Sequence, residues 1–368
     1  MYPDTIRVHR SHLLRVASLS DEMHLLDLVT DLPTDNPKLP CVVLAHNEGH
    51  ILREFLDHYR RVGVDRFYIV DDRSTDGSSE ILRSQQDVTV YSPVEGSTYA
   101  RDKRYWRSQL MDRHCSGRWV LVPDLDEHLV YRDSESRDIF ALIRSLEDEG
   151  AEALHALMLD MYSNTSLNAH RHNCGRLIDS FPLFDGPDHY FRIAAPAKFR
   201  AKYPVPFALA IGGMRQRLFD PLAMQRGSPS ARLLRGLCDI GGDFSPDGFE
   251  RLKLQWARFK LKPLLRSVAL YNCSKIPLLK WRKGMWFYNG AHAVSQPLRL
   301  SRQRAVLLHF KFAAGVDALR YTAIRGQHAS GSQFYKRILT QDQVLASSPV
   351  FEGSHLYYSS QSLGRFLS

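Results

Sequence analysis

Short apolar runs alternate with amphipathic segments along the first half of the chain. Five runs rich in apolar and β-branched residues predict buried strands, at residues 41–45, 66–70, 88–91, 119–122 and 153–159. Apolar side chains recur at helical spacing over residues 51–59 and 139–146, and a basic helix is predicted to begin at Tyr99. This alternation predicts a mostly parallel sheet wound with helices, in which ligands bind beyond the carboxyl ends of the strands.

The fourth of these runs, Trp119-Val-Leu-Val122, ends in a group of three carboxylates, Asp124, Asp126 and Glu127. Carboxylates are costly to bury unless cations neutralise them. Two Asp residues at positions i and i+2 of an extended segment point the same way, which suits oxygen ligation of Mg²⁺ or Mn²⁺. The alternative is a solvated acidic turn after a core strand.

Composition places the chain among ordinary globular proteins, with 44% hydrophobic and 11% aromatic residues. No apolar stretch has the length needed to cross a bilayer, and the N-terminal residues lack the pattern of a secretory signal. Five scattered cysteines without a C-x-x-C pair argue against a disulfide framework or a structural zinc site. We therefore expect a cytoplasmic protein with reduced thiols.

Positive and negative residues are distributed unevenly along the chain, which its net charge of +9 does not show. Residues 198–337 contain 26 Lys and Arg against 6 Asp and Glu, or +20, and the remainder sums to −11. This basic part is expected to face an anionic partner, unless it is only a solvated surface. Residues 224–268 have helical spacing and many cations, which favours peripheral contact with an anionic membrane at its inner face.

The pattern divides the chain into five predicted segments. Residues 1–39 form a β extension and a linker rich in turn formers, and residues 40–220 form the α/β core, whose strand ends carry the candidate ligand-binding residues. Residues 221–275 are a basic, partly helical insertion. Residues 276–330 are predicted to complete the ligand site, and residues 331–368 form a C-terminal tail.

Three motifs in this order resemble family-2-like glycosyltransferases with the GT-A fold. They are Ala45-His-Asn-Glu48, Ile69-Val-Asp-Asp-Arg-Ser-Thr-Asp-Gly77 and the Asp-x-Asp motif Asp124-Leu-Asp-Glu127. The later segments Lys275–Trp281, Gly290–His292 and Leu307–Lys311 resemble, more weakly, a bacterial branch related in pattern to family-92-type enzymes. The resemblance implies a Rossmann-like α/β fold with a mostly parallel central sheet flanked by helices, followed by a basic C-terminal extension.

The resemblance also implies a reaction and a set of site residues. A sugar would move from a nucleotide-sugar donor, most simply a UDP-sugar, to a hydroxyl of a glycan, lipid-linked or small-molecule acceptor, with inversion and in polysaccharide biosynthesis. No nucleic acid is expected as a partner. The metal ligands for Mn²⁺ or Mg²⁺ would be Asp124, Asp126 and His309, with His292 as the second candidate histidine. The donor would contact Ala45, Asn47, Glu48, Asp71, Asp72, Arg101, Lys103, Asp124 and Lys311.

Two of these assignments have plain structural alternatives. Asp71 and Asp72 lie in a segment whose residues also favour a helix-capping turn. A single histidine such as His309 is more often a hydrogen-bonded structural residue than a ligand.

The general base is the least defined part of this prediction. The Glu-Asp pair usual in family-2 enzymes is not evident after residue 200. Asp160 at a strand end is the first candidate, with Glu127 as a further catalytic candidate beside the metal motif. Other candidates for the base are Asp243, Asp247 and Glu250, and a capping or turn role for Asp160 is the alternative.

Three other functions compete with glycosyl transfer. A haloacid-dehalogenase-type phosphatase also uses Asp-x-Asp, but with Thr or Val where this chain has His128, and on the first strand of its domain. A sugar nucleotidyltransferase would open with a glycine-rich phosphate loop, which residues 45–48 lack. A non-catalytic glycosyltransferase-like protein that binds an anionic glycan or membrane would have an incomplete metal site.

Overall fold

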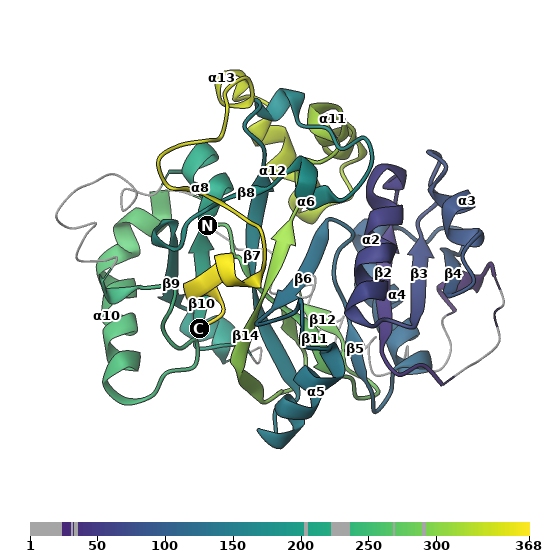
Figure 1. The fold of residues 1–368 in the computed structure, drawn as a ribbon, viewed down its shortest axis with the longest axis horizontal. Coiled ribbons are helices and arrows are strands. Elements are labelled where there is room, and N and C mark those ends of the chain that lie inside the picture. The colour runs from purple at the N-terminus through teal and green to yellow at the C-terminus, as the bar shows by residue number, and fades with distance from the viewer. Residues whose placement is uncertain are drawn as a thin grey trace.

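One mixed sheet organises the protein (Figure 1). The computed structural model describes residues 24–30, 32, 36–201, 205–221, 236–267, 269–288 and 292–368. Within them the main strands follow the order β1-β4-β3-β2-β5-β11-β7-β14-β6, with β8 joined to β7 and β15 to β8. Their bounds are β1 Leu26–Leu28, β2 Pro40–Ala45, β3 Arg66–Asp71, β4 Val88–Pro93, β5 Trp119–Leu121, β6 Glu127–Tyr131, β7 Ala153–Tyr162, β8 Leu183–Asp185, β11 Ser274–Lys280, β14 Leu300–His309 and β15 Ser354–Leu356.

The direction of the strands matches the prediction of a mostly parallel sheet. β4, β3, β2 and β5 are parallel neighbours, and β7 is parallel to β14. β11 lies between β5 and β7 and is antiparallel to both, so those two strands share a direction. β6 is antiparallel to β14, and β1 to β4. The predicted α/β class with a mostly parallel central sheet is confirmed.

Helices cover both faces of this sheet. Side chains alternate along β2, so Cys41 and Val43 pack in one cluster with Phe55 of α2, while Val42 packs in another with Trp106 of α4. The helices are α2 Gly49–Val62, α3 Ser78–Arg83, α4 Tyr99–His114, α5 Ile139–Asp148, α6 Leu177–Ser180, α7 Ala197–Arg200, α8 Gly213–Phe219, α10 Gly248–Ser267, α11 Gly315–Arg325, α12 Ala329–Ile338 and α13 Asp342–Leu345. A strand buried on both faces explains the unbroken apolar runs of the sequence.

The sharp end of α2 shows how a single glycine shapes this packing. Gly63 follows the last helical residue with φ of +117°, and its N–H donates to the carbonyl oxygens of Tyr59 and Arg60. A Cβ at this position would lie 2.9 Å from the Ile139 side chain at the start of α5. Both the backbone conformation and the close approach of α5 therefore require glycine.

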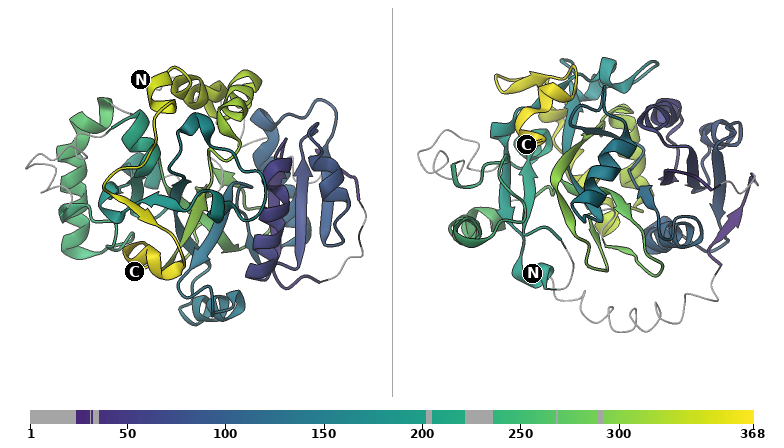
Figure 2. Two further views of the ribbon diagram at one scale, coloured as in Figure 1. Left: turned by 45° about the horizontal axis from the view of Figure 1, so that its top comes forward. Right: turned by 60° about the horizontal axis from the view of Figure 1, so that its bottom comes forward.

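Two smaller groups flank the central sheet. β9 Tyr190–Ala194 and β10 Ala208–Gly212 form a hairpin-like pair, against which α10 packs at the outer edge of the molecule (Figure 1). β12 Phe287–Tyr288 and β13 Ala293–Val294 form a second pair near α4. Figure 2 shows α11 and α12 together at one end of the sheet. Both helices follow β14, and α11 contacts His46 and Asp72, which follow β2 and β3, through Tyr321 and Arg325.

The segments predicted from the sequence map onto this architecture in part. The helix predicted within residues 224–268 is present as α10, whereas residues 222–235 and most of the predicted N-terminal extension lie outside the described residues. The five segment boundaries stay predictions, although β11 and β14 of the fourth segment share the sheet of the second. In the described part of the chain, no helix is both long and apolar enough to traverse a bilayer.

We expect Phe55→Ala to lower the free energy of unfolding by about 3–5 kcal/mol, because it empties a fully buried site between α2 and the sheet. Arg53→Ala, on the exposed face of the same helix, should change it by less than about 0.5 kcal/mol. Urea unfolding followed by circular dichroism measures both. Equal effects of the two substitutions would contradict the assigned helix face.

Candidate functional site

The Asp-x-Asp motif forms a tight turn between β5 and β6. The N–H of Glu127 donates to the carbonyl oxygen of Asp124 at 3.0 Å, and the N–H of Asp124 donates to Glu127 Oε2 at 3.0 Å. Glu127 is only 1% exposed. Its carboxylate therefore closes the turn from inside, whereas Asp124 and Asp126 keep partial access to solvent.

A lysine from the later half of the chain neutralises this turn. Lys275, on β11 beside β5, donates from Nζ to Asp124 Oδ2 at 2.5 Å and to Glu127 Oε1. Arg107 of α4 donates to Asp124 Oδ1 at 3.2 Å. Burial alone would raise the pKa of Asp124, but the charges of Lys275 and Arg107 outweigh it and hold this pKa below its usual value.

His309 lies at the centre of a chain of polar contacts. On β14 it is paired with Glu127 of β6 on one side and with Asp160 of β7 on the other. Its Nε2 is 3.3 Å from Asp126 Oδ2, and its Nδ1 is 2.7 Å from Asp160 Oδ1. Burial lowers the pKa of His309, but the charge of Asp126 and the hydrogen bonds to Asp126 and Asp160 together outweigh it, so the pKa lies above its usual value.

Asp160 is in turn held by Arg215 of α8, whose Nε donates to its two oxygens at 2.8 and 2.9 Å. Burial would raise the pKa of Asp160, but the charges of Arg215 and His309 and their hydrogen bonds together hold it below its usual value. A carboxylate that fixes a histidine in this way sets which nitrogen faces the site. Here Nε2 is the nitrogen that faces Asp126.

Two further predicted residues lie on the same cleft. Lys311 Nζ is 3.4 Å from Asp126 Oδ2 and 5.1 Å from the ring centre of Tyr335. His292 Nδ1 is 2.6 Å from the carbonyl oxygen of Ser274. Burial and then the charge of Lys275 lower the pKa of His292 to about 4, so the ring is neutral near pH 7.

Asp126, Glu127 and His309 offer three ligand atoms that lie within 4.8 Å of one another. Two carboxylate oxygens and one imidazole nitrogen are a donor set that suits Mn²⁺ or Mg²⁺. Because Nδ1 of His309 is hydrogen-bonded to Asp160, Nε2 is the nitrogen available to a metal ion. The residues present therefore fit a divalent cation. Glu127, which was predicted as a catalytic residue, lies among the candidate metal ligands.

Protein side chains also balance the charge of this site without a metal. Four carboxylates, Asp124, Asp126, Glu127 and Asp160, are in contact with the four permanent cations Arg107, Arg215, Lys275 and Lys311. Arg and Lys side chains therefore supply the cations that burial of these carboxylates requires.

A cleft with a volume of about 550 Å³ opens in front of the turn. α4 lines one side with Tyr99, Arg101, Lys103, Arg104 and Arg107, and Glu48, Asp124, Asp126, His292, Lys311 and His328 are among the residues that line the rest. Of the predicted donor contacts, Arg101 points back to Asp102 and Gly96. Lys103 lies over the ring of Tyr99 at 4.6 Å.

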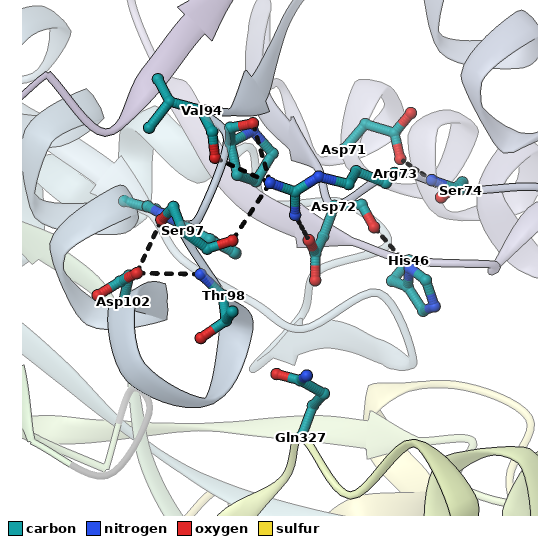
Figure 3. Close-up of polar contacts among 12 residues, drawn as sticks. His46, Asp71, Asp72, Arg73, Ser74, Val94, Ser97, Thr98, Asp102 and Gln327 are labelled. Carbon is teal, nitrogen blue, oxygen red and sulfur yellow. Dashed lines mark hydrogen bonds and ion pairs between the residues drawn. The ribbon is translucent and has the colours of Figure 1, made fainter.

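The end of β2 and the residues after it border an adjoining pocket, which Tyr321 and Arg325 of α11 also line. Figure 3 shows Arg73 turned back across the strand ends, with donated bonds to Asp72 at 3.0 Å and to the Val94 carbonyl at 2.9 Å. The carboxylate of Asp72 also contacts Arg325. His46 donates from Nδ1 to the Asp72 carbonyl oxygen at 2.7 Å, and its Nε2 is 2.7 Å from the Tyr321 hydroxyl.

The remaining strand-end residues are mostly engaged in local structure. Asp71 accepts from the N–H of Ser74 at 3.0 Å and from Ser79, as expected of a turn that precedes a helix. Asn47 accepts from the N–H of Thr75 at 2.7 Å. The Ala45 carbonyl accepts from the N–H of Asp72.

Glu48 differs from these residues because it lines the cleft and the adjoining pocket. Loss of hydration and then the nearby Asp126 raise its pKa to about 8. Its protonation state therefore depends on what occupies the cleft.

The candidates for the general base lie in two places. Asp160 is at the site but engaged by Arg215 and His309. Asp243 and Asp247 line a different cavity, next to His155 and Arg304, and Glu250 pairs with Arg192. Of the candidates for the base, only Asp160 therefore lies at the candidate site. Asp243, Asp247 and Glu250 lie around the start of α10.

Sequence reasoning did not assign a role to four cations that the structure places at the site: Arg107, Arg215, Lys275 and Arg325. Arg107 lies in the predicted basic helix, and Lys275 lies in a segment that resembles the family. The sequence did not indicate which carboxylates they contact. Arg215 and Arg325 lie 55 and 253 residues from the carboxylates that they contact. The excess of positive charge over residues 198–337 was the one available signal.

Comparisons with known proteins agree with this geometry. Residues 41–148 match the family model described as glycosyl transferase family 2. A glycosyltransferase family 92 protein of Oryza sativa subsp. japonica is 29% identical over 107 residues, which cover 26% of this chain and 17% of that relative. The predicted resemblance to family-2-like glycosyltransferases is confirmed over residues 41–148, which include the Asp-x-Asp turn.

Solved structures resemble the chain only distantly. TarS of S. aureus has a TM-score of 0.25 and 16% identity, covering 34% of this chain and 22% of TarS. The mannosyltransferase PcManGT of Pyrobaculum calidifontis, solved with GDP-Man and Mn²⁺, has a TM-score of 0.26 and 19% identity, covering 40% of this chain and 43% of the other. Likenesses at this level carry no argument about the ligands of this chain.

We expect Lys275→Met to lower the free energy of unfolding by about 3–5 kcal/mol near pH 8, because it leaves Glu127 buried without a cation. Burial and Asp124 hold the pKa of Glu127 above its usual value already, and loss of the lysine would raise it further. A carboxyl with a raised folded-state pKa stabilises below its unfolded pKa and loses that contribution as pH rises through the folded pKa. The deficit should therefore shrink towards about pH 5.

Urea unfolding at the two pH values measures this difference. Lys280→Met, at the exposed end of the same strand, should cost less than about 1 kcal/mol at either pH. Adding Glu127→Gln to Lys275→Met should recover part of the loss near pH 8, since it removes the unpaired charge. A deficit that is independent of pH would show that packing, and not charge, holds the lysine in place.

Proposed function

We propose that this protein is a glycosyltransferase that moves a sugar from a nucleotide-diphosphate donor to a hydroxyl group of an acceptor. The observation that carries the proposal is the convergence in one cleft of the Asp124–Asp126 turn, the basic face of α4, and His309 and Lys311 from the end of β14. The turn and α4 fall within the family-2 match, and His309 and Lys311 come from outside it. Such a cleft offers both the acidic and the basic groups that a sugar nucleotide requires.

The donor would lie with its nucleoside in the pocket beyond the end of β2, where Arg325 contacts Asp72, and its diphosphate towards Lys311 and Arg107. Asp72 is the proposed hydrogen-bond acceptor for the base or ribose, with Asn47 and Glu48 beside it. Uracil is the proposed base, on the resemblance alone. Departure of the nucleotide diphosphate leaves negative charge on its terminal phosphate, which the Lys311 ammonium would stabilise.

Asp126 and His309 are the proposed ligands of a divalent cation, Mn²⁺ or Mg²⁺, with Glu127 or Asp124 as a further oxygen donor. When bound, this cation would supply Lewis-acid stabilisation of the diphosphate. His292 remains the second candidate histidine, and its neutral ring could donate or accept a hydrogen bond in the same cleft.

The contacts of Asp160 and Glu127 support positioning roles more than proton transfer. Asp160 orients His309 and is itself paired with Arg215. Glu127 closes the turn and is paired with Lys275. The proposed acceptor is a hydroxyl of a glycan, a lipid-linked sugar or a small molecule, and the base that removes its proton is left unassigned.

Asp126→Ala should abolish Mn²⁺-dependent binding of nucleoside diphosphates while the protein remains folded, because it removes charge at a partly exposed rim and no volume from the core. Isothermal calorimetry with UDP, GDP and dTDP, each with Mn²⁺ or with EDTA, measures this. Asp148→Ala, on the exposed end of α5, is the matched control and should bind like the native protein. If no nucleotide binds the native protein in either condition, the non-catalytic alternative is favoured.

His309→Gln and Lys311→Met should weaken nucleotide binding in different ways. His309→Gln should raise the Mn²⁺ concentration needed for half-maximal binding by about tenfold or more, because a predicted ligand is lost. Lys311→Met should weaken UDP binding with Mn²⁺ and also with EDTA, since its charge acts on the diphosphate directly. Identical effects of the two variants on the Mn²⁺ requirement would reject this division of roles.

A further inference from the structure

α10 presents two apolar faces, and only one of them packs against the protein. Leu254, Ala257 and Leu261 are buried, and two of them join a cluster with residues of β9 and β10. On the other side, Phe249, Leu252, Trp256 and Phe259 are 82%, 63%, 47% and 68% exposed. These four residues are called the α10 stripe below.

The spacing of the α10 stripe places its members on one side of the helix. Steps of three, four and three residues bring side chains above one another, so the stripe runs for about 15 Å along the helix axis. α10 lies at the outer edge of the molecule in every view (Figures 1 and 2). Scattered exposed apolar residues need no explanation, but four large ones in a line on a convex edge indicate a contact surface.

Cations border the stripe on both sides. Helical spacing puts Lys253 and Lys260 along one edge and Arg251 and Lys262 along the other, and Lys260 Nζ is 5.6 Å from the ring centre of Trp256. Residues 248–262 contain five Lys or Arg and one Glu, for a net charge of +4. The one acidic residue, Glu250, is paired with Arg192 of β9. The outward surface of α10 is therefore apolar along its middle and positive at its margins.

We propose that the α10 stripe is a docking surface for an anionic lipid bilayer. A helix lying in the interface buries Phe, Trp and Leu at the boundary of the acyl chains, while Lys and Arg beside them contact anionic headgroups. A soluble acidic glycan would match the cations but would leave the four apolar side chains in water. The convex helix and its positive margins also complement a negatively charged planar surface better than a second, equally positive copy of this chain.

This docking does not depend on the proposed enzymatic activity. Failure of nucleotide binding would leave it intact, and failure of docking would leave the nucleotide site intact. The two proposals involve different residues and different measurements.

The test is co-sedimentation of the full chain with vesicles of phosphatidylcholine, with or without phosphatidylglycerol. We expect binding to the anionic vesicles that weakens steeply as salt is added. The double variant Leu252→Gln/Phe259→Gln should lower the partition coefficient by about tenfold or more, because it removes buried apolar area. Leu356→Gln/Tyr358→Gln removes two side chains that are 57% and 71% exposed elsewhere, and should leave the partition coefficient unchanged.

Two further variants separate the apolar and the electrostatic contributions. Lys260→Gln/Lys262→Gln should weaken binding to anionic vesicles and flatten its salt dependence. Native protein should show a blue shift of tryptophan emission on binding, and Trp256→Phe should lose most of that shift while it still sediments with the vesicles. All changed side chains are exposed, so melting temperatures should stay near the native value.

Three outcomes would overturn the proposal. One is absence of binding to anionic vesicles at low salt. Another is undiminished binding of Leu252→Gln/Phe259→Gln, which would move the contact to another basic surface. The third is a concentration-dependent dimer in sedimentation velocity that the same double variant dissociates, which would assign the stripe to a second copy of the chain.

Discussion

Neutralisation of buried carboxylates is the constraint on which the site depends. The turn after β5 brings together the buried carboxylate of Glu127 and the partly buried carboxylates of Asp124 and Asp126. Unpaired charges are costly in such surroundings. Lys275, 151 residues from Asp124, and Lys311, 185 residues from Asp126, supply the balancing charge. The charge balance of the turn therefore depends on two segments late in the chain, β11 and the residues that follow β14.

The register of β14 with its two neighbouring strands determines where His309 lies. His309 is level with Glu127 on β6 and with Asp160 on β7, so its ring lies between the acidic turn and the Asp160–Arg215 pair. A slip of one residue in β14 would turn His309 to the other face of the sheet. The apolar residues Val306, Leu307 and Leu308 resist such a slip, because each is buried against its own face. Packing of the core therefore sets the position of the histidine.

The division of charge along the chain has its explanation largely inside the molecule. The acidic early part contributes Asp72, Asp124, Asp126, Glu127 and Asp160, and the basic later part contributes Arg215, Lys275, Lys311 and Arg325 as their partners. Part of the +20 over residues 198–337 is thus used within the site and is not left for an external anion. Arg251, Lys260 and Lys262 of α10 lie apart from this network and are exposed.

The sequence alone determined the strand and helix alternation, the Asp-x-Asp turn and the resemblance to family-2 glycosyltransferases, because periodicity and short motifs are local properties of the chain. It also pointed to His309 and Lys311, through a motif of five residues, but not to what they contact. Tertiary structure alone decided that Lys275 lies between Asp124 and Glu127, that Asp160 is paired with Arg215, and that the outward face of α10 is apolar. These facts depend on the order and register of strands far apart in the chain, and the pattern around any one residue carries no information about its distant partner.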